Sequence, residues 1–149
     1  MVTIKTGDLL KAKETIIGHQ VNCFGVAAGL ASAVFRKWPY AKNDYLQLIK
    51  NVQAKSLLGM AHFTGRQKDG HIICNLFGQY DAGAAYNPKK LESALEQLGN
   101  FARTTGYSVA LPWKLSCGIA GGDWDEVQRI IERNMEDVEC VIYRREGDV

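Results

Sequence analysis

Short hydrophobic runs alternate along the chain with longer segments in which hydrophobic residues recur every three or four positions. The short runs are rich in β-branched and apolar residues, which is typical of strands. They lie at residues 2–5, 15–21, 57–64, 71–77, 107–111 and 140–143. The longer segments predict helices at residues 30–38, at 41–52, from Pro88 to the residue before Gly106, and at 124–135.

The order of these elements predicts an α/β fold. Helices separate most of the strands, and Lys68-Asp69-Gly70 suits a hairpin turn between the third and fourth strands. A sheet with helices on both faces, in three layers, accommodates this order, and the hairpin makes the sheet mixed. We expect one domain spanning residues 1–149, because no linker or internal repeat interrupts the pattern.

Two glycine-bearing loops follow predicted strands and open predicted helices, at residues 18–29 and 116–124. Backbone N–H groups at such junctions have no partner within the helix, and the helix dipole adds positive charge. The pair therefore predicts a site for a diphosphate, the alternative being that the glycines only form tight turns. Neither loop has the sequence of a P-loop or of a Rossmann fingerprint.

Composition narrows the function classes. With 18 Lys and Arg against 16 Asp and Glu, the net charge is +2, which does not favour nucleic acid as a partner. The four cysteines and three histidines show no metal-ligand spacing, so we expect no metal and no cofactor. An early acid, Asp8, and the lack of a long apolar stretch predict a cytoplasmic protein without signal peptide or membrane span.

Three segments together resemble the macrodomain family. They are residues 7–10 (GDLL), residues 19–31 (HQVNCFGVAAGLA) and residues 111–124 (LPWKLSCGIAGGDW), and residues 141–143 match the family's last strand. The resemblance implies a three-layer α-β-α fold with a central mixed sheet and a cleft that binds ADP-ribose. Within the family, the chain is most similar to the branch of ADP-ribose-1″-phosphate phosphatases, which implies hydrolysis of that phosphomonoester to ADP-ribose and phosphate.

The resemblance also assigns ligand-binding roles. Asp8 and Leu9 would hold the adenine edge and Tyr143 would pack on its face, while Asn22 would bond the distal ribose. The alternatives are a turn aspartate, a packed strand-end tyrosine and an asparagine that bonds its own loop. The backbone of both loops would wrap the diphosphate, at Ala27, Ala28, Gly29, Leu30, Ser116, Cys117, Gly118, Ile119, Ala120, Gly121 and Gly122.

Catalysis is assigned by the same resemblance to His19 and Asp81. A histidine with a pKa of about 6.5 can transfer protons near neutral pH, and Asp81 would orient water or protonate the leaving group. The alternatives are a packed strand-end histidine and a solvated loop aspartate.

One departure bears on the reaction. Relatives that remove ADP-ribose from proteins have an aspartate where this chain has Ala120, and their catalytic lysine has no counterpart in residues 77–80. Two other functions stay open: a hydrolase acting on ADP-ribosylated macromolecules or on O-acetyl-ADP-ribose, and a reader that binds ADP-ribose without turnover.

Overall fold

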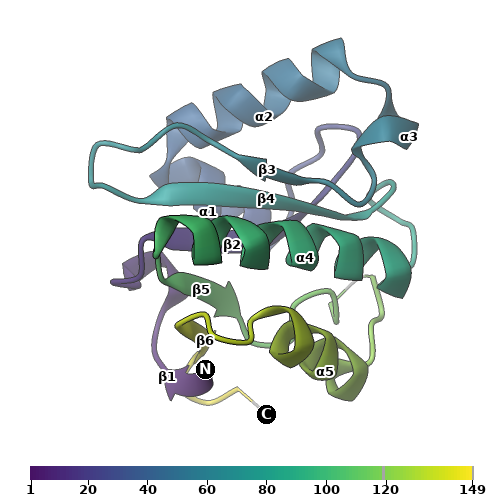
Figure 1. Cartoon of the computed structure of the whole chain (residues 1–149). Coiled ribbons are helices and arrows are strands. Elements are labelled where there is room, and N and C mark those ends of the chain that lie inside the picture. Colours follow the sequence, from purple (N-terminus) through teal and green to yellow (C-terminus); the bar gives the residue numbers. More distant parts are fainter. Residues whose placement is uncertain (119, 149) are drawn as a thin grey trace.

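Strands of the computed structural model, which describes residues 1–118 and 120–148, form one sheet in the order β1-β6-β5-β2-β4-β3 (Figure 1). Their bounds are β1 Val2–Thr6, β2 Ile16–Asn22, β3 Ala61–Phe63, β4 Ile72–Gln79, β5 Val109–Pro112 and β6 Cys140–Arg144. All neighbouring pairs are parallel except β3 and β4, which form an antiparallel hairpin. The carboxyl ends of the parallel strands therefore meet at one edge of a mixed sheet.

Helices cover both faces of this sheet and complete three layers. Helices α4 (Pro88–Thr105) and α5 (Trp124–Asn134) lie on one face, toward the viewer in Figure 1. The opposite face carries α1 (Leu30–Lys37), α2 (Pro39–Asn51), α3 (Ala54–Leu57) and the 3-10 turn η1 (Leu9–Lys11). The predicted three-layer α/β fold is confirmed.

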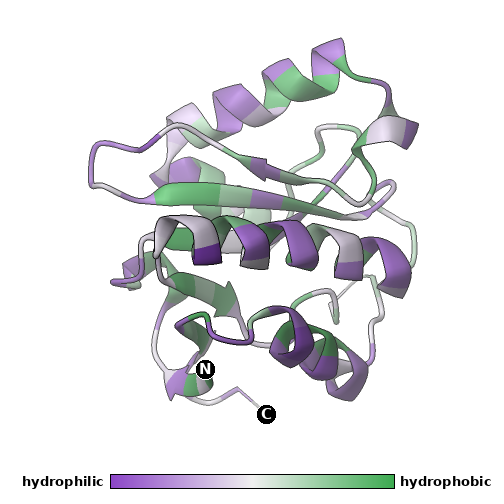
Figure 2. Cartoon of the chain, in the orientation of Figure 1, coloured by the Kyte–Doolittle hydropathy of each residue, from purple (hydrophilic) through white to green (hydrophobic). Residues whose placement is uncertain are grey.

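Each face of the sheet has its own hydrophobic core, and β2 contributes to both. Ile16 packs with α4 and α5, whereas Ile17 packs with α1 and α2. Successive side chains of a strand point to opposite faces, so a central strand covered on both sides reads as a continuous apolar run. Figure 2 shows this as hydrophobic colour along much of β4 and β5 and hydrophilic colour on the outer sides of α4 and α5.

One predicted strand is wrong over half of its length. Residues 57–64 read as a strand, but residues 54–57 form α3 and only Ala61–Phe63 pair with β4. Leu57 is buried at the end of α3, and Gly59 reverses the chain with a φ of 93°. A short apolar run is compatible with a buried helix end as well as with a strand, so periodicity alone did not separate the two.

The second helix begins two residues before the predicted residue 41. Pro39 follows the end of α1 and occupies the first position of α2, where its missing N–H costs nothing. The hairpin turn at Lys68-Asp69-Gly70 lies between β3 and β4 as predicted, with Gly70 at a φ of 91°. Among the described residues, no helix is long and apolar enough to cross a membrane.

Candidate functional site

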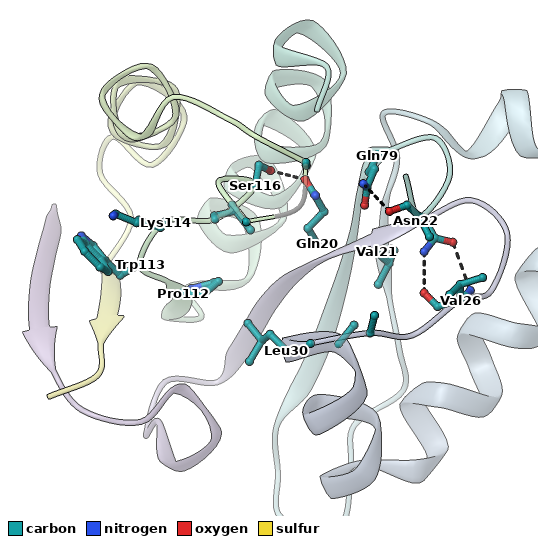
Figure 3. Close-up of a pocket in the computed structure, with 17 residues that line it drawn as sticks. Gln20, Val21, Asn22, Val26, Leu30, Gln79, Pro112, Trp113, Lys114 and Ser116 are labelled. Carbon is teal, nitrogen blue, oxygen red and sulfur yellow. Dashed lines mark hydrogen bonds between the residues drawn. The ribbon is translucent and has the colours of Figure 1, made fainter. Parts of the chain in front are cut away.

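A cleft of about 350 Å³ opens at the carboxyl ends of β2, β4 and β5 (Figure 3). Open α/β sheets bind their ligands at this edge. Seven of the predicted ligand-binding residues line the cleft: Asn22, Ala28, Gly29, Leu30, Ser116, Gly118 and Ala120. Nine predicted site residues do not belong to the described lining: Asp8, Leu9, His19, Ala27, Asp81, Cys117, Gly121, Gly122 and Tyr143. Ile119 lies outside the described residues.

The start of α1 is an uncapped helix N-terminus that faces the cleft. Gly29 is its N-cap residue, with φ 55° and ψ −126°, and it supplies no side chain to bond the first N–H groups. Leu30 and Ala31, the first residues of α1, line the cleft. The free N–H groups and the helix dipole together make this a suitable place for a phosphate.

The second loop contributes backbone and one hydroxyl, but not a helix N-terminus. The side chain of Asp123 caps α5 by accepting a hydrogen bond from Asp125 N at 3.0 Å. Asp125 and Glu126 add negative charge to the first turn. The Asp123 side chain occupies one of the first N–H groups of α5, and the two acids oppose a bound anion there, so this helix start suits a phosphate less well than that of α1. The predicted role of the loop in binding a diphosphate stays a prediction.

A hydrogen bond across the cleft floor joins the two loops. Ser116, which has a φ of 65°, donates its hydroxyl to Oε1 of Gln20 at the end of β2. The N–H of Gly122 donates to Ser116 O at 2.8 Å, and a side chain at Gly122 would collide with that carbonyl. Gly122 thus acts by letting the loop close tightly behind Ser116.

Asn22 lies at one end of the cleft and bonds its own loop. Its Nδ2 donates to Val26 O at 2.6 Å, and its Oδ1 accepts from the N–H groups of Phe24 and Val26 at 3.0 and 3.3 Å. Tyr45 donates its hydroxyl to the carbonyl of Asn22 at 2.7 Å. These bonds shape the first loop, as the structural alternative for Asn22 predicted, while the residue still borders the cleft.

None of the three residues assigned to adenine belongs to the described lining of the cleft. Asp8 caps η1 by accepting from Leu10 N at 3.0 Å, and Leu9 is buried. Tyr143 donates its hydroxyl to Glu14 at 2.6 Å. Burial, together with this carboxylate, raises the pKa of the Tyr143 phenol to about 12. Their adenine-binding roles stay predictions.

His19 lies in the core rather than in the cleft. Its side chain is on the α1 face of β2, 0% exposed, and its ring packs edge-on against Phe35 with centroids 5.2 Å apart. Nε2 is 2.6 Å from Oδ1 of Asn75, whose Nδ2 lies 3.2 Å from Nδ1 of His62. Burial lowers the pKa of His19 to about 4, although the bond to Asn75 partly offsets this.

An imidazole that is neutral at pH 7 and enclosed by other side chains is poorly placed to exchange a proton with a ligand in the cleft. The contacts of His19 thus favour a structural role over the predicted catalytic one, which no observation tests directly. His19 points into the core because successive side chains of β2 alternate between the two faces of the sheet. Residues 18 and 20 face α4, whereas residues 17, 19 and 21 face α1.

Asp81 lies on an exposed loop beside the Asn22 end of the cleft. Its carboxylate accepts from Gly83 N at 3.1 Å, and its neighbours Gln79 and Ala82 line the cleft. No carboxylate belongs to the lining that the structure describes, so Asp81 is an acid at the rim rather than in the floor. Its catalytic role stays a prediction.

Thiol chemistry has little support at this site. Burial raises the pKa of Cys23 to about 11, and it also raises the pKa of the half-buried Cys117. The thiolate is the nucleophilic form, so neither cysteine is activated near neutral pH. No cluster of three potential metal ligands occurs in the part of the chain that the structure describes.

Sequence reasoning missed several lining residues at strand ends. Gln20, Gln79 and Pro112 border the cleft, each near the carboxyl end of its strand. The signal was available in principle, because a polar residue at the end of a buried parallel strand lies at the ligand-binding edge. Gln20 is the clearest case of such a polar strand-end residue. Gly78 leaves room for its side chain, because a Cβ at residue 78 would lie only 2.6 Å from Gln20 Oε1.

The end of the cleft opposite Asn22 is cationic and aromatic. Trp113 and Lys114 line it, and Nζ of Lys114 lies 4.6 Å from the centroid of the Trp113 ring (Figure 3). The guanidinium of Arg144 lies 4.4 Å from the same ring. Lys114 is the one ionisable side chain in the described lining, so the charge of the cleft is positive.

Comparison with known proteins places these features in a family. The family model described as "Macro domain" matches residues 19–131. The ADP-ribose 1″-phosphate phosphatase of Saccharomyces cerevisiae is 23% identical over an alignment 174 residues long, which covers 96% of this chain and 98% of the yeast protein. The DNA ADP-ribosyl glycohydrolase of Mycobacterium tuberculosis is 32% identical over 154 residues; these cover 99% of this chain but only 43% of the mycobacterial protein.

Solved structures share the fold. The macrodomain of Mycobacterium tuberculosis DarG superposes with a TM-score of 0.82 at 31% identity, covering 96% of this chain and 97% of that one. Thermosipho africanus DarTG in complex with ADP-ribose has a TM-score of 0.84 at 22% identity, covering 99% of this chain and 42% of that one. The second likeness, at this identity, bears on fold alone.

Proposed function

This chain belongs to the Macro domain family, and from that premise we propose that its cleft binds ADP-ribose. The observation that carries the proposal is the uncapped N-terminus of α1, with Gly29, Leu30 and Ala31 lining a cleft at the carboxyl edge of the sheet. A diphosphate fits this place because it accepts hydrogen bonds from backbone N–H groups and is attracted by the helix dipole. The cleft volume is within the range of ligand pockets, about 300–1,000 Å³.

The ligand would lie along the cleft with its distal ribose near Asn22 and its adenosine toward Trp113. This direction follows from the roles that the resemblance gives to Asn22 and Tyr143, since the N–H of Trp113 donates to Tyr143 O at 3.0 Å. The diphosphate would then lie between the α1 N-terminus and the loop at Ser116 and Gly118.

The reaction that we propose is hydrolysis of ADP-ribose-1″-phosphate to ADP-ribose and inorganic phosphate. Water would add to phosphorus while the bond between phosphorus and the 1″ oxygen breaks. Asp81, at the Asn22 end, would orient the water and accept its proton, and that proton would then pass to the departing 1″ oxygen, which leaves as the hydroxyl of ADP-ribose. Backbone N–H groups would stabilise the phosphoryl oxygens. The yeast relative's name and near-complete mutual coverage support this choice.

The test is a calorimetric titration with ADP-ribose followed by a phosphate-release assay with ADP-ribose-1″-phosphate. Wild type and Asp81→Asn are compared, with Asp125→Asn, an exposed acid on α5, as the matched control. Removing a general base typically costs about 10²- to 10⁴-fold in rate. Full activity in Asp81→Asn would refute the role of Asp81, and an absence of ADP-ribose binding would refute the function.

A second candidate is removal of ADP-ribose from nucleic acid. The mycobacterial relative named as a DNA ADP-ribosyl glycohydrolase has the higher identity, 32%. At the Asn22 end, Phe24 is 49% exposed and Tyr80 is 37% exposed, and their rings pack edge-to-face with centroids 5.1 Å apart. Exposed aromatic rings beside a cleft can stack on a base of a single strand.

The two candidates differ in their products. Release of ADP-ribose from ADP-ribosylated single-stranded DNA, weakened by Phe24→Ala and Tyr80→Ala, would support the second. Release of phosphate from ADP-ribose-1″-phosphate by the same protein, unaffected by these two changes, would support the first.

A further inference from the structure

Three carboxamide side chains belong to the described lining of the cleft, and they differ in what their N–H groups bond. Nδ2 of Asn22 donates to Val26 O at 2.6 Å, within its own loop. Nε2 of Gln79 donates to Ala84 O at 2.7 Å. Nε2 of Gln20 has no acceptor among the residues that the structure describes, although Oε1 of the same side chain accepts a hydrogen bond. The Gln20 amide therefore has two N–H groups available for a ligand.

The Gln20 amide is held from two sides. The hydroxyl of Ser116 donates to Oε1, which assigns the donor role to the other terminal atom, Nε2. The backbone of β4 lies against the amide, because a Cβ at Gly78 would be 2.6 Å from Oε1 and 3.4 Å from Cδ. Figure 3 shows the end of the Gln20 side chain turned toward Ser116. A half-buried amide held in this way loses little side-chain entropy when it binds a ligand.

Ser116 is itself fixed on both sides. It has a φ of 65°, in the left-handed region that residues other than glycine rarely adopt. Its carbonyl accepts from the N–H of Gly122 at 2.8 Å, and its hydroxyl bonds Gln20. Strained residues held by their surroundings occur mainly at functional sites. The Gln20 amide is thus joined to a rigid part of the second loop.

The position of this amide along the ligand rests on the proposed function. The distal ribose is assigned to Asn22, two residues further along β2, and the diphosphate to the space between the α1 N-terminus and the loop at Ser116. The amide belongs to β2 and is bonded to Ser116, so it lies between these two places. The part of ADP-ribose that falls there is the phosphate next to the distal ribose. Its oxygens are charged acceptors, and no carboxylate of the described lining competes for the amide.

We propose that Gln20 binds ADP-ribose directly, by donating an N–H group of its side chain to the phosphate next to the distal ribose. The α1 N-terminus supplies backbone N–H groups to the diphosphate, and Gln20 adds a side-chain donor from the cleft floor. Hydrogen bonds to a charged acceptor are stronger than those between neutral groups. Gln20 is therefore a specificity residue that favours nucleoside diphosphates over monophosphates.

The experiment measures the dissociation constants of ADP-ribose, ADP and AMP by calorimetry. Gln20→Met removes the amide, whereas Gln20→Glu keeps an oxygen for the Ser116 hydroxyl and replaces the N–H donors by a charged oxygen. We expect ADP-ribose to bind Gln20→Met about tenfold less tightly, which corresponds to about 1.4 kcal/mol. Gln20→Glu should bind it more weakly still, because its carboxylate repels the phosphate. The preference for ADP over AMP should fall about tenfold in Gln20→Met, since AMP has no phosphate at this place.

Two further variants separate direct binding from other effects. Ser116→Ala removes the bond between the loops and leaves the amide. If Gln20 acted only by holding the loop, Ser116→Ala would lose as much of the preference for ADP as Gln20→Met, and that result would overturn the inference. Gln47→Glu is the matched control for charge, at an exposed position of α2 outside the described lining. A loss of affinity equal to that of Gln20→Glu would show a general charge effect and would also overturn it.

Urea unfolding checks that each variant is folded before titration, and Gln20→Met is sufficient for the test if Gln20→Glu does not fold. Wild-type affinity for ADP-ribose and ADP in Gln20→Met would overturn this inference and leave the proposed function intact. Failure of the wild type to bind ADP-ribose would refute the proposed function itself.

Discussion

Replacing Gly29 by alanine separates backbone strain from phosphate binding. Gly29 combines φ 55° with ψ −126°, outside the left-handed helical region that other residues sometimes visit. Holding an alanine in such a conformation costs about 1–3 kcal/mol. No atom lies within 4 Å of the added Cβ, so the folded protein has room for the methyl group and strain is the main cost.

Because Gly29 lines the cleft next to the first N–H groups of α1, we expect the added methyl group to take up space that a phosphate there would need. A phosphate displaced by it would lose one or two charge-assisted hydrogen bonds, each worth about 1.5–3 kcal/mol. The affinity for ADP-ribose should therefore fall about ten- to a hundredfold or more. Urea unfolding measures the strain, and calorimetric titration measures the binding.

Gly70→Ala is the control for strain alone. Gly70 also has a positive φ, 91°, and open space around its Cβ position, but it lies in the turn between β3 and β4, outside the cleft lining. We expect both variants to lose similar stability and only Gly29→Ala to lose binding. Unchanged affinity in Gly29→Ala would refute the placement of the diphosphate at α1.

Three further predictions concern groups away from the cleft. The pKa of His19 is about 4 in the folded chain and 6.5 in the reference state. The unfolded chain binds the extra proton between these values, so stability should fall as the pH drops from 7 to 4, by on the order of 3 kcal/mol. Urea unfolding should show a shallower pH dependence in His19→Asn, and equal dependence would contradict the burial argument. Gly99→Ala should destabilise the fold by about 1–3 kcal/mol or more, because its Cβ would lie 2.1 Å from Asn134 O, whereas Gly83→Ala, with a nearest contact of 3.9 Å, should not. Burial raises the pKa of Cys23 to about 11, so Cys23 should resist iodoacetamide until urea exposes it. Labelling of Cys23 in the folded protein as fast as in the urea-unfolded protein would contradict this.

Local sequence signals were sufficient for most of the fold. The glycines of residues 18–29 predicted the turn into α1, and Pro88 and Gly106 predicted the limits of α4, where Gly106 has a φ of 77°. These signals act through the backbone of the residue itself. The run at residues 57–64 failed because its hydrophobic residues are buried in α3 and β3 alike.

The site was harder to predict because it depends on facing directions and distant partners. A central strand buried on both faces shows no alternation of polar and apolar residues, so the sequence did not reveal that His19 points away from the cleft. The capping of α5 by Asp123 was readable, since an aspartate directly precedes the helix. The meeting of Trp113 with Arg144 depends on the pairing of β5 with β6, which no local pattern states.

The position of β6 inside the sheet has a consequence for the order in which the chain can fold during synthesis. β6 is synthesised after every other strand of the described sheet and pairs with both β1 and β5, so β1 finds no neighbour in this sheet until residues 140–144 emerge. Closing contacts of such long sequence separation is slow, because the entropy of a large loop must be lost first. A nascent chain would therefore expose β5 as an edge that can pair with other chains, and a chaperone that shields this edge should raise the yield of folded protein.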